Sequence, residues 1–197
     1  MIEVKGKGCI SAKVIADSIS EDDTRITTFE LEYNRFIHGE MLTHRQFSRN
    51  SASSRAIPIH KMIEQVRTNP AMPIHWGAAQ KGMRAENECD NTVLVTYYDG
   101  FDWDDVPYDK HDAWQKYAED VAQFAQTFEE AGYAKQIVNR LLEPFQVMKT
   151  IVTATEFDNF FNLRCHRDAQ PEIQELANCM REAREESTPK KLRAGQW

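Results

Sequence analysis

The sequence lacks the motifs by which several large classes of protein bind their ligands. It contains neither a GxGxxG nor a GxxxxGK segment, so nucleotide binding of the Rossmann or P-loop kind is not supported. It also has no HExxH motif, no cysteine–histidine cluster at zinc-ligand spacing and no GxSxG nucleophile motif. A phosphate site in this chain must therefore be built in another way.

Long hydrophobic runs are missing as well. No apolar stretch approaches the roughly 20 residues that cross a bilayer, and the alternating, charged N-terminus is not that of a signal peptide. The four cysteines form no CxxC pair, which favours reduced thiols in a cytoplasm over a disulfide framework. A formal net charge of -7 leaves no broad basic face for nucleic acid. We expect a cytoplasmic protein with no membrane or nucleic-acid partner.

Hydrophobic periodicity predicts an α+β fold, in which long helices pack around a mixed or antiparallel sheet. The expected strands cover 2–15, 25–33 and 148–157, and Phe29, Leu31 and Tyr33 fall on the apolar side of the second. The expected helices cover 35–47, 59–66, 109–133, 134–145, 156–164 and 168–183. The longest helix carries a stripe that we assign to the core, made of Trp114, Tyr117, Ala118, Val121, Phe124, Ala125 and Phe128.

The ends of these elements lead to further expectations. Asp168 is the expected N-cap of the last helix. The stretch after Phe47 is expected to be a loop, because serine competes for backbone hydrogen bonds. We expect one α+β domain over residues 1–187 and a basic tail at 188–197. Two interpretations of the tail stay open: the sequence is cut from a longer chain there, or the tail docks on a partner.

No metal site is expected. The aspartates in DGFDWDDVPYD, residues 99–109, lack a calcium-loop pattern, and they are assigned to a solvated acidic loop.

Cations and hydroxyl groups concentrate in one stretch, THRQFSRNSASSR, residues 43–55. Guanidinium groups match phosphate oxygens bidentately, and the neighbouring hydroxyl groups add further donors. The stretch therefore predicts a site for a phosphorylated small molecule. A solvated loop with incidental arginines is the alternative interpretation.

The spacing of this stretch is specific. The pattern H-R-x-x-S-x-N-x-x-S-x-R is carried by His44, Arg45, Ser48, Asn50, Ser53 and Arg55. It resembles the signature of the flavin-dependent thymidylate synthases, R-H-R-x-x-S-x-N-x-x-S-x-R, with Thr43 in place of the first arginine. NFFNLRCHRDAQPEIQELA, residues 159–177, and QIVNRLLEP, which contains Arg140 and Pro144, are also similar to blocks of that family.

The resemblance implies an α+β homotetramer whose active sites are shared between subunits. It also implies reductive methylation, in which a methylene group passes from methylenetetrahydrofolate to C5 of dUMP with the help of FAD reduced by NADPH. The implied flavin-contacting positions are Thr43, His44, Arg45, Asn50, Ser51, Thr153, Thr155 and Asn159. The implied dUMP-contacting positions are Glu40, Thr43, Ser51, Ser53, Arg55, Arg140 and Arg164. The implied catalytic roles are polarisation of the uracil edge by Arg164 and orientation of the nucleotide by Ser53.

The sequence departs from the family pattern in several places. SISEDDTRITTF, before and within the second expected strand, lacks the family's early histidine, and Asp168 stands where the family often has a histidine. Thr43 and Thr155 stand where the family has flavin-contacting arginines, and Thr153 stands at the position of its asparagine. A divergent branch, such as those of bacteriophages, fits these departures. Two alternatives stay open: a related flavin enzyme that modifies another pyrimidine nucleotide, for example by hydroxymethylation, or a nucleotide-binding protein that has lost flavin chemistry.

Overall fold

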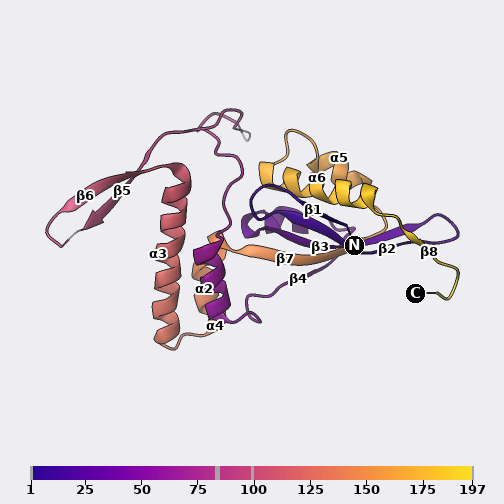
Figure 1. Cartoon of the computed structure of the whole chain (residues 1–197), viewed down its shortest axis with the longest axis horizontal. Helices are drawn as coiled ribbons and strands as arrows, with labels where there is room; N and C mark the ends of the chain where they lie inside the picture. Colours follow the sequence, from indigo (N-terminus) through magenta and orange to yellow (C-terminus); the bar gives the residue numbers. More distant parts are fainter. Residues whose placement is uncertain (1, 83–84, 99, 197) are drawn as a thin grey trace. The chain divides into compact units, whose positions relative to one another are not determined.

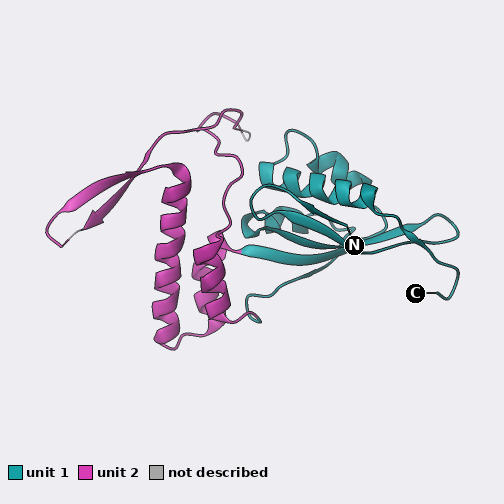
Figure 2. Ribbon diagram, viewed as in Figure 1, with its two compact units in different colours: residues 1–56, 147–197 teal, residues 57–146 magenta. Residues whose placement is uncertain are grey.

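The computed structural model describes residues 2–82, 85–98 and 100–196, and it divides into two compact units (Figures 1 and 2). Unit 1 comprises Met1–Ala56 and Val147–Trp197, and unit 2 comprises Ile57–Gln146. Its helices and largely antiparallel sheet confirm the α+β fold. The single domain over residues 1–187 stays a prediction.

Unit 1 contains a six-stranded sheet in which β1, β2, β3, β7 and β4 are neighbours in that order. Its strands are β1 (Glu3–Lys5), β2 (Ser11–Ile19), β3 (Arg25–Asn34), β4 (Ser48–Ser51), β7 (Val147–Ala154) and β8 (Lys190–Lys191). Successive strands of this series are antiparallel, whereas β8 pairs with β2 in parallel. The predicted tail thus contains a short strand. The long strand expected over 2–15 is two strands, β1 and β2.

Helices cover one face of this sheet (Figure 1). They are α5 (Asp158–Arg164) and α6 (Pro171–Glu186). Unit 1 also contains α1 (His38–Leu42), which follows a 3-10 turn at Arg35–Ile37. Phe29, Leu31 and Tyr33 are fully buried, which confirms the predicted apolar side of β3. Because side chains alternate along a strand, β3 can bury these three side chains on the face toward α6 while Glu30 stays exposed.

The start of α6 differs from the prediction. Gln170 rather than Asp168 is the N-cap, and its side chain accepts a hydrogen bond from the backbone N–H of Ile173 at 3.4 Å. Pro171 occupies the first turn, where its missing N–H costs no helical hydrogen bond.

Unit 2 is built from helices and one hairpin. Its elements are α2 (Ile59–Thr68), β5 (Val93–Tyr98), β6 (Trp103–Tyr108), α3 (Lys110–Glu130), α4 (Lys135–Leu141) and a 3-10 turn at Glu143–Phe145. Asp109 caps α3 by accepting from the N–H groups of His111 and Asp112. Gly132, with φ of 84°, follows its end as predicted.

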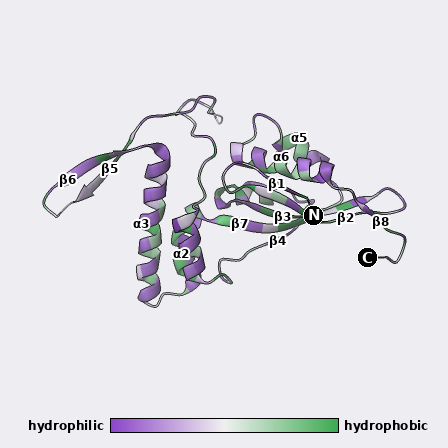
Figure 3. Ribbon diagram, viewed as in Figure 1, coloured by the Kyte–Doolittle hydropathy of each residue, from purple (hydrophilic) through white to green (hydrophobic). Residues whose placement is uncertain are grey.

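The aromatic stripe assigned to the core of unit 2 is partly wrong. Ala118, Ala122 and Ala125 are fully buried, whereas Tyr117, Phe124 and Phe128 are 64%, 64% and 37% exposed. Small side chains let α3 approach α2 and α4 closely, so the buried face is centred on the alanines. Hydrophilic residues dominate much of the rest of α3 (Figure 3).

The hairpin of β5 and β6 was not predicted. Part of the segment expected to be a solvated acidic loop is β6, and Asp105 accepts a hydrogen bond from the Thr96 hydroxyl at 2.7 Å across the hairpin. Cross-strand pairing of this kind depends on a partner that periodicity within one strand does not reveal. In the described ranges, no helix is both long and apolar enough to span a bilayer.

Packing of α6 on the sheet gives a direct test of the fold. Leu176 is fully buried, and Leu42 on α1 is 46% exposed. We expect Leu176→Ala to lower the free energy of unfolding by about 2–5 kcal/mol, because it leaves a cavity. The matched change Leu42→Ala should cost less than about 1 kcal/mol. Urea unfolding followed by circular dichroism measures both, and similar losses would contradict the assigned core.

Candidate active site

The cation-rich stretch begins as a turn rather than as the continuation of a helix. The helix expected over 35–47 ends at Leu42, because side chains take up the carbonyl groups that a longer helix would use. Arg49 donates from Nη1 to the carbonyl oxygens of Met41 and His44, both at 3.0 Å. The Thr43 hydroxyl donates to the carbonyl of Glu40 at 2.6 Å. These bonds fix the turn that presents His44 and Arg45.

The serine-rich stretch after this turn is partly an edge strand, so the loop prediction is corrected. β4 pairs with β7, with Asn50 opposite Ile151 and Ser51 opposite Thr150. Pairing with a neighbouring strand outweighs the low strand propensity of serine and asparagine. Because side chains alternate, Arg49 and Ser51 lie on one face of the sheet and Asn50 lies on the other.

Arg164, at the end of α5, is held by three groups of the turn and α1. Its Nη1 donates to Glu40 Oε2 at 3.0 Å, and its Nε donates to His44 Nε2 at 2.9 Å. A longer contact of 3.4 Å joins Nη2 to the Thr43 hydroxyl. The two shorter contacts hold Nη1 and Nε of a planar guanidinium, so its orientation is set before any ligand arrives.

His44 is neutral in this arrangement. Burial, followed by the positive charges of Arg164 and Arg49, lowers the pKa of His44 from 6.5 to about 4. Since the arginine nitrogen can only donate, Nε2 of His44 must accept, which assigns its proton to Nδ1. The ring packs edge-on against Phe160 with centroids 4.8 Å apart and also contacts Phe47. An apolar wall therefore favours the uncharged imidazole.

These groups border a pocket of about 340 Å³ in unit 1. Its lining residues are Thr43, His44, Arg45, Gln46, Phe47, Glu156, Asn159, Phe160, Leu163 and Arg164. Five positions that the family resemblance implies thus meet at one pocket, and a sixth, Glu40, binds Arg164. Arg45 and Asn159 are exposed there, and Arg45 makes no ion pair within the described part of the chain.

Other implied positions lie elsewhere. Thr153 faces away from Ser51 and shares a 2.9 Å hydrogen bond with Thr28, and Thr155 is exposed after the end of β7. Ser53 and Arg55 are exposed in the turn beyond β4, where Ser53 Oγ accepts from the N–H of Arg55 at 3.3 Å. Arg140 lies on α4 of unit 2 and is exposed.

Sequence reasoning missed a buried polar chain behind β4. The Tyr33 hydroxyl lies 2.9 Å from His38 Nδ1 and 2.8 Å from the Thr150 hydroxyl, which in turn donates to Ser51 Oγ at 3.0 Å. A hydroxyl on the apolar side of β3 was the available signal, because a buried tyrosine hydroxyl needs a partner. The role of Arg49 in fixing the turn was also missed.

The pocket brings together a fixed guanidinium, an exposed arginine and an amide on an α+β unit without a glycine-rich loop. Guanidinium groups are common partners of anionic ligands. The chain belongs to a known family: the family model described as thymidylate synthase complementing protein matches residues 24–190. These are the flavin-dependent thymidylate synthases, so the resemblance seen in the sequence is confirmed.

Two solved structures are similar in fold. Both are crystal structures of a UMP/dUMP methylase, PolB from Streptomyces cacaoi, one bound with 5-Br UMP and one with 5-Br dUMP. The TM-scores are 0.62 and 0.61, and each is 16% identical in sequence. The first match covers 90% of this chain and 89% of that chain, and the second covers 91% of each. No curated protein matches the sequence.

The neutral state of His44 makes stability depend on pH. In the unfolded chain His44 protonates near pH 6.5, but in the folded chain it protonates only near pH 4. The unfolded state therefore binds more protons between these values, and stability falls as the pH drops from about 6.5 to about 4. We expect His44→Gln to remove part of this loss and give a shallower curve of unfolding midpoint against pH.

Urea unfolding at several pH values measures the effect. Burial also lowers the pKa of His38, so the comparison with the wild type isolates the contribution of His44. Gln46→Ala, in the same turn, removes no titratable group and should keep the wild-type slope. Parallel curves for the wild type and His44→Gln would show that His44 is not held neutral.

Proposed function

We propose that the chain is an FAD-dependent thymidylate synthase, a cytoplasmic homotetramer that converts dUMP to dTMP with methylenetetrahydrofolate and NADPH. Family membership supports the reaction class. The observation that carries the assignment to this pocket is the placement of Arg164, fixed by Glu40 and His44 beside the exposed donors Arg45 and Asn159.

In the proposal, Arg164 polarises the uracil ring of dUMP. As C5 becomes nucleophilic, negative charge develops on the N3 edge, and a guanidinium fixed beforehand stabilises it without reorganising. Arginine stays protonated at any working pH, so the stabilisation does not depend on a proton equilibrium. Glu40 and His44 hold Nη1 and Nε, and within the described part of the chain Nη2 has only the 3.4 Å contact with Thr43. Nη2 is thus the atom assigned to the substrate.

The residues present fit a phosphate-bearing flavin. Arg45 supplies an exposed cation for a phosphate group, and Asn159 supplies an amide. His44 is uncharged, so it does not repel the arginines beside it. When bound, FAD supplies the reducing equivalents that reductive methylation requires. A volume of about 340 Å³ is small among ligand pockets, which supports completion of the site by a second subunit.

We assign the orientation of the nucleotide to hydroxyl groups and arginines that lie outside this pocket and later in the sequence than the cation-rich turn. Ser51 is positioned by Thr150 and Tyr33, whereas Ser53 and Arg55 are exposed and free to follow the phosphate of dUMP. Arg140 is assigned to the same phosphate on the strength of the family resemblance.

The role of Arg164 gives the sharpest test of this proposal. We expect the purified wild type, loaded with FAD, to show a flavin absorbance band that shifts when dUMP is added. Arg164→Gln should keep the flavin, lose the shift and reduce turnover of dUMP about 100-fold or more, because one preorganised donor is lost. Arg167→Gln is a matched control, since Arg167 is exposed and, among the described residues, pairs only with its neighbour Asp168.

Two results would contradict the proposal in different ways. Equal turnover in the wild type and Arg164→Gln would remove Arg164 from the reaction. A wild type that binds dUMP but retains no flavin would select the alternative in which flavin chemistry has been lost, as Thr43 and Thr155 in place of arginines would explain.

A second candidate is methylation of a uridine nucleotide other than dUMP. The similar PolB structures are of an enzyme described as a UMP/dUMP methylase, and one contains a ribonucleotide analogue. Comparing UMP with dUMP in the same assay separates the two candidates. Turnover of UMP within tenfold of dUMP supports the broader specificity, and turnover of dUMP alone rejects it.

A further inference from the structure

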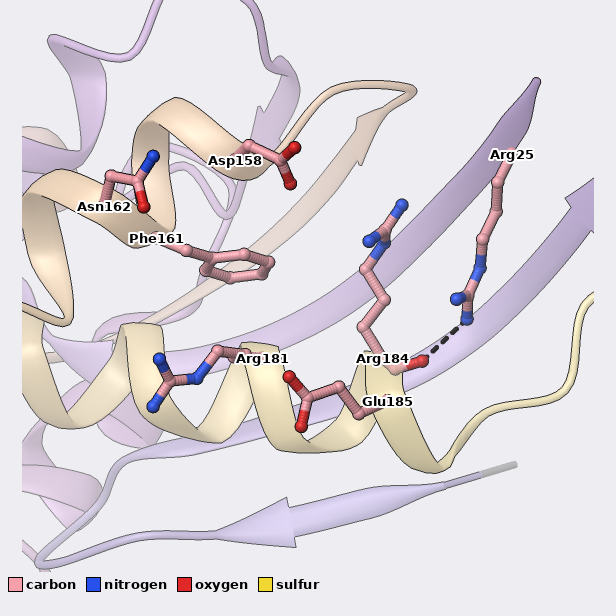
Figure 4. A pocket seen from close by; sticks show the side chains of 7 residues that line it. All are labelled: Arg25, Asp158, Phe161, Asn162, Arg181, Arg184 and Glu185. Carbon is pink, nitrogen blue, oxygen red and sulfur yellow. Dashed lines mark hydrogen bonds between the residues drawn. The ribbon is translucent and has the colours of Figure 1, made fainter. Parts of the chain in front are cut away.

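A second pocket of unit 1 borders the face of α5 opposite the candidate active site, and Figure 4 shows the side chains that line it. On this short helix, Asn159, Phe160, Leu163 and Arg164 line the first pocket, whereas Asp158, Phe161 and Asn162 line the second. At 100° per residue these two sets point in opposite directions. The second pocket has a volume of about 350 Å³ and is completed by Arg25 from β3 and by Arg181, Arg184 and Glu185 from α6.

One of its three arginines is held by the fold. Arg25 donates from Nε and Nη2 to the carboxylate of Asp17, at 2.9 and 2.6 Å. Its Nη2 also donates to the carbonyl oxygen of Arg184 at 2.7 Å (Figure 4). Arg25 therefore joins β2, β3 and the end of α6, and its Nε and Nη2 are engaged by the protein itself.

The other two arginines have spare donors. Within the described ranges, Arg184 donates from Nε alone, to the Thr27 hydroxyl at 3.4 Å, and Arg181 donates from Nη2 alone, to Asn178 at 3.3 Å. Neither forms an ion pair with a carboxylate in the described ranges. Figure 4 shows the side chain of Arg184 projecting from α6 toward the part of α5 that carries Asp158.

Arg184 is also half-buried. Its guanidinium carbon lies 5.3 Å from the centroid of the Phe157 ring, and burial and the charge of Arg25 lower the pKa of Arg184. The carboxylates of Asp17, Asp158 and Glu156 attract Arg184, but none forms an ion pair with it in the described ranges, so a bound anion would offset more of the cost of burying this cation. The guanidinium fork is moreover suited to the oxygens of a phosphate group.

The remaining wall of the pocket has a different chemistry. Phe161 stacks on Phe157 with centroids 5.8 Å apart, and the amide of Asn162 is exposed beside it. The carboxylates of Asp158 and Glu185 would repel a bare anion, but they can accept hydrogen bonds from amino or hydroxyl groups. The pocket thus suits a ligand with an anionic end and an aromatic end that carries donors. Its volume is at the lower limit for small molecules and matches one nucleotide better than a dinucleotide.

We propose that this pocket is a second ligand site that binds a nucleoside monophosphate, with the phosphate at Arg181 and Arg184 and the base beside Phe161 and Asn162. The ligand would be separate from the substrate of the candidate active site, because α5 lies between the two pockets.

Titration calorimetry with AMP tests this proposal, since AMP has a phosphate group and an exocyclic amine that can donate to a carboxylate. We expect one AMP per chain, bound with unchanged affinity by Arg164→Gln. Arg181→Gln and Arg184→Gln should each weaken binding about tenfold or more, because each removes a charge-assisted hydrogen bond. Arg167→Gln removes the same charge from an exposed site and should bind AMP normally. Inorganic phosphate should compete with AMP but bind at least tenfold more weakly.

Several outcomes would overturn the site. Unchanged affinity in both arginine variants would remove these arginines from it, and loss of binding in Arg164→Gln would place AMP in the candidate active site. Equal affinities for AMP and inorganic phosphate would show that the nucleoside part of AMP contributes nothing to binding, which would contradict the contact of the base with Phe161 and Asn162. Arg181 is exposed, so Arg181→Gln keeps the test decisive even where Arg184→Gln weakens the packing against Phe157.

Discussion

The aromatic contacts of Phe157 and Phe160 determine how α5, the cation-rich turn and the sheet lie together. The ring of Phe157 packs edge-on against Phe29 of β3, with centroids 5.4 Å apart. The rings of Phe157 and Phe160 each lie 5.1 Å, between centroids, from the ring of Phe47. Phe47 lies between the cation-rich turn and β4, so this aromatic cluster fixes the turn and α5 together. Arg164 can then reach Glu40 and His44 only because two segments more than a hundred residues apart share one apolar contact.

The arginines of unit 1 fall into two groups according to what neutralises or binds them. Arg25, Arg49 and Arg164 are each held by carboxylate, carbonyl or imidazole acceptors, and each joins separate elements. Arg45 and Arg181 are exposed with few partners, and Arg184 is half-buried with one weak hydrogen bond. Guanidinium groups that are already satisfied organise the fold, while those with spare donors can serve ligands.

Local patterns in the sequence predicted what depends on one element, and failed where two elements decide together. Alternation placed Phe29, Leu31 and Tyr33 in the core, and motif spacing brought His44, Arg45, Asn159 and Arg164 to one pocket. The strand β4 exists because β7 offers an open edge, which a serine-rich segment does not reveal. On α3 the partner helices selected the alanine face over the aromatic one. Arg140 and the subunit contacts stay predictions.

Threonine at position 43 changes the charge of the turn as well as its contacts. It accepts from Arg164 and donates to the Glu40 carbonyl, so it ends α1 and orients the guanidinium without adding a cation. An arginine there would repel Arg164 and Arg49, whose charges already lower the pKa of His44. Anion binding in this pocket must then rest on fewer cations, and Arg45 is the exposed one. With threonine at position 43, the proposed phosphate contacts in this pocket therefore depend more strongly on Arg45.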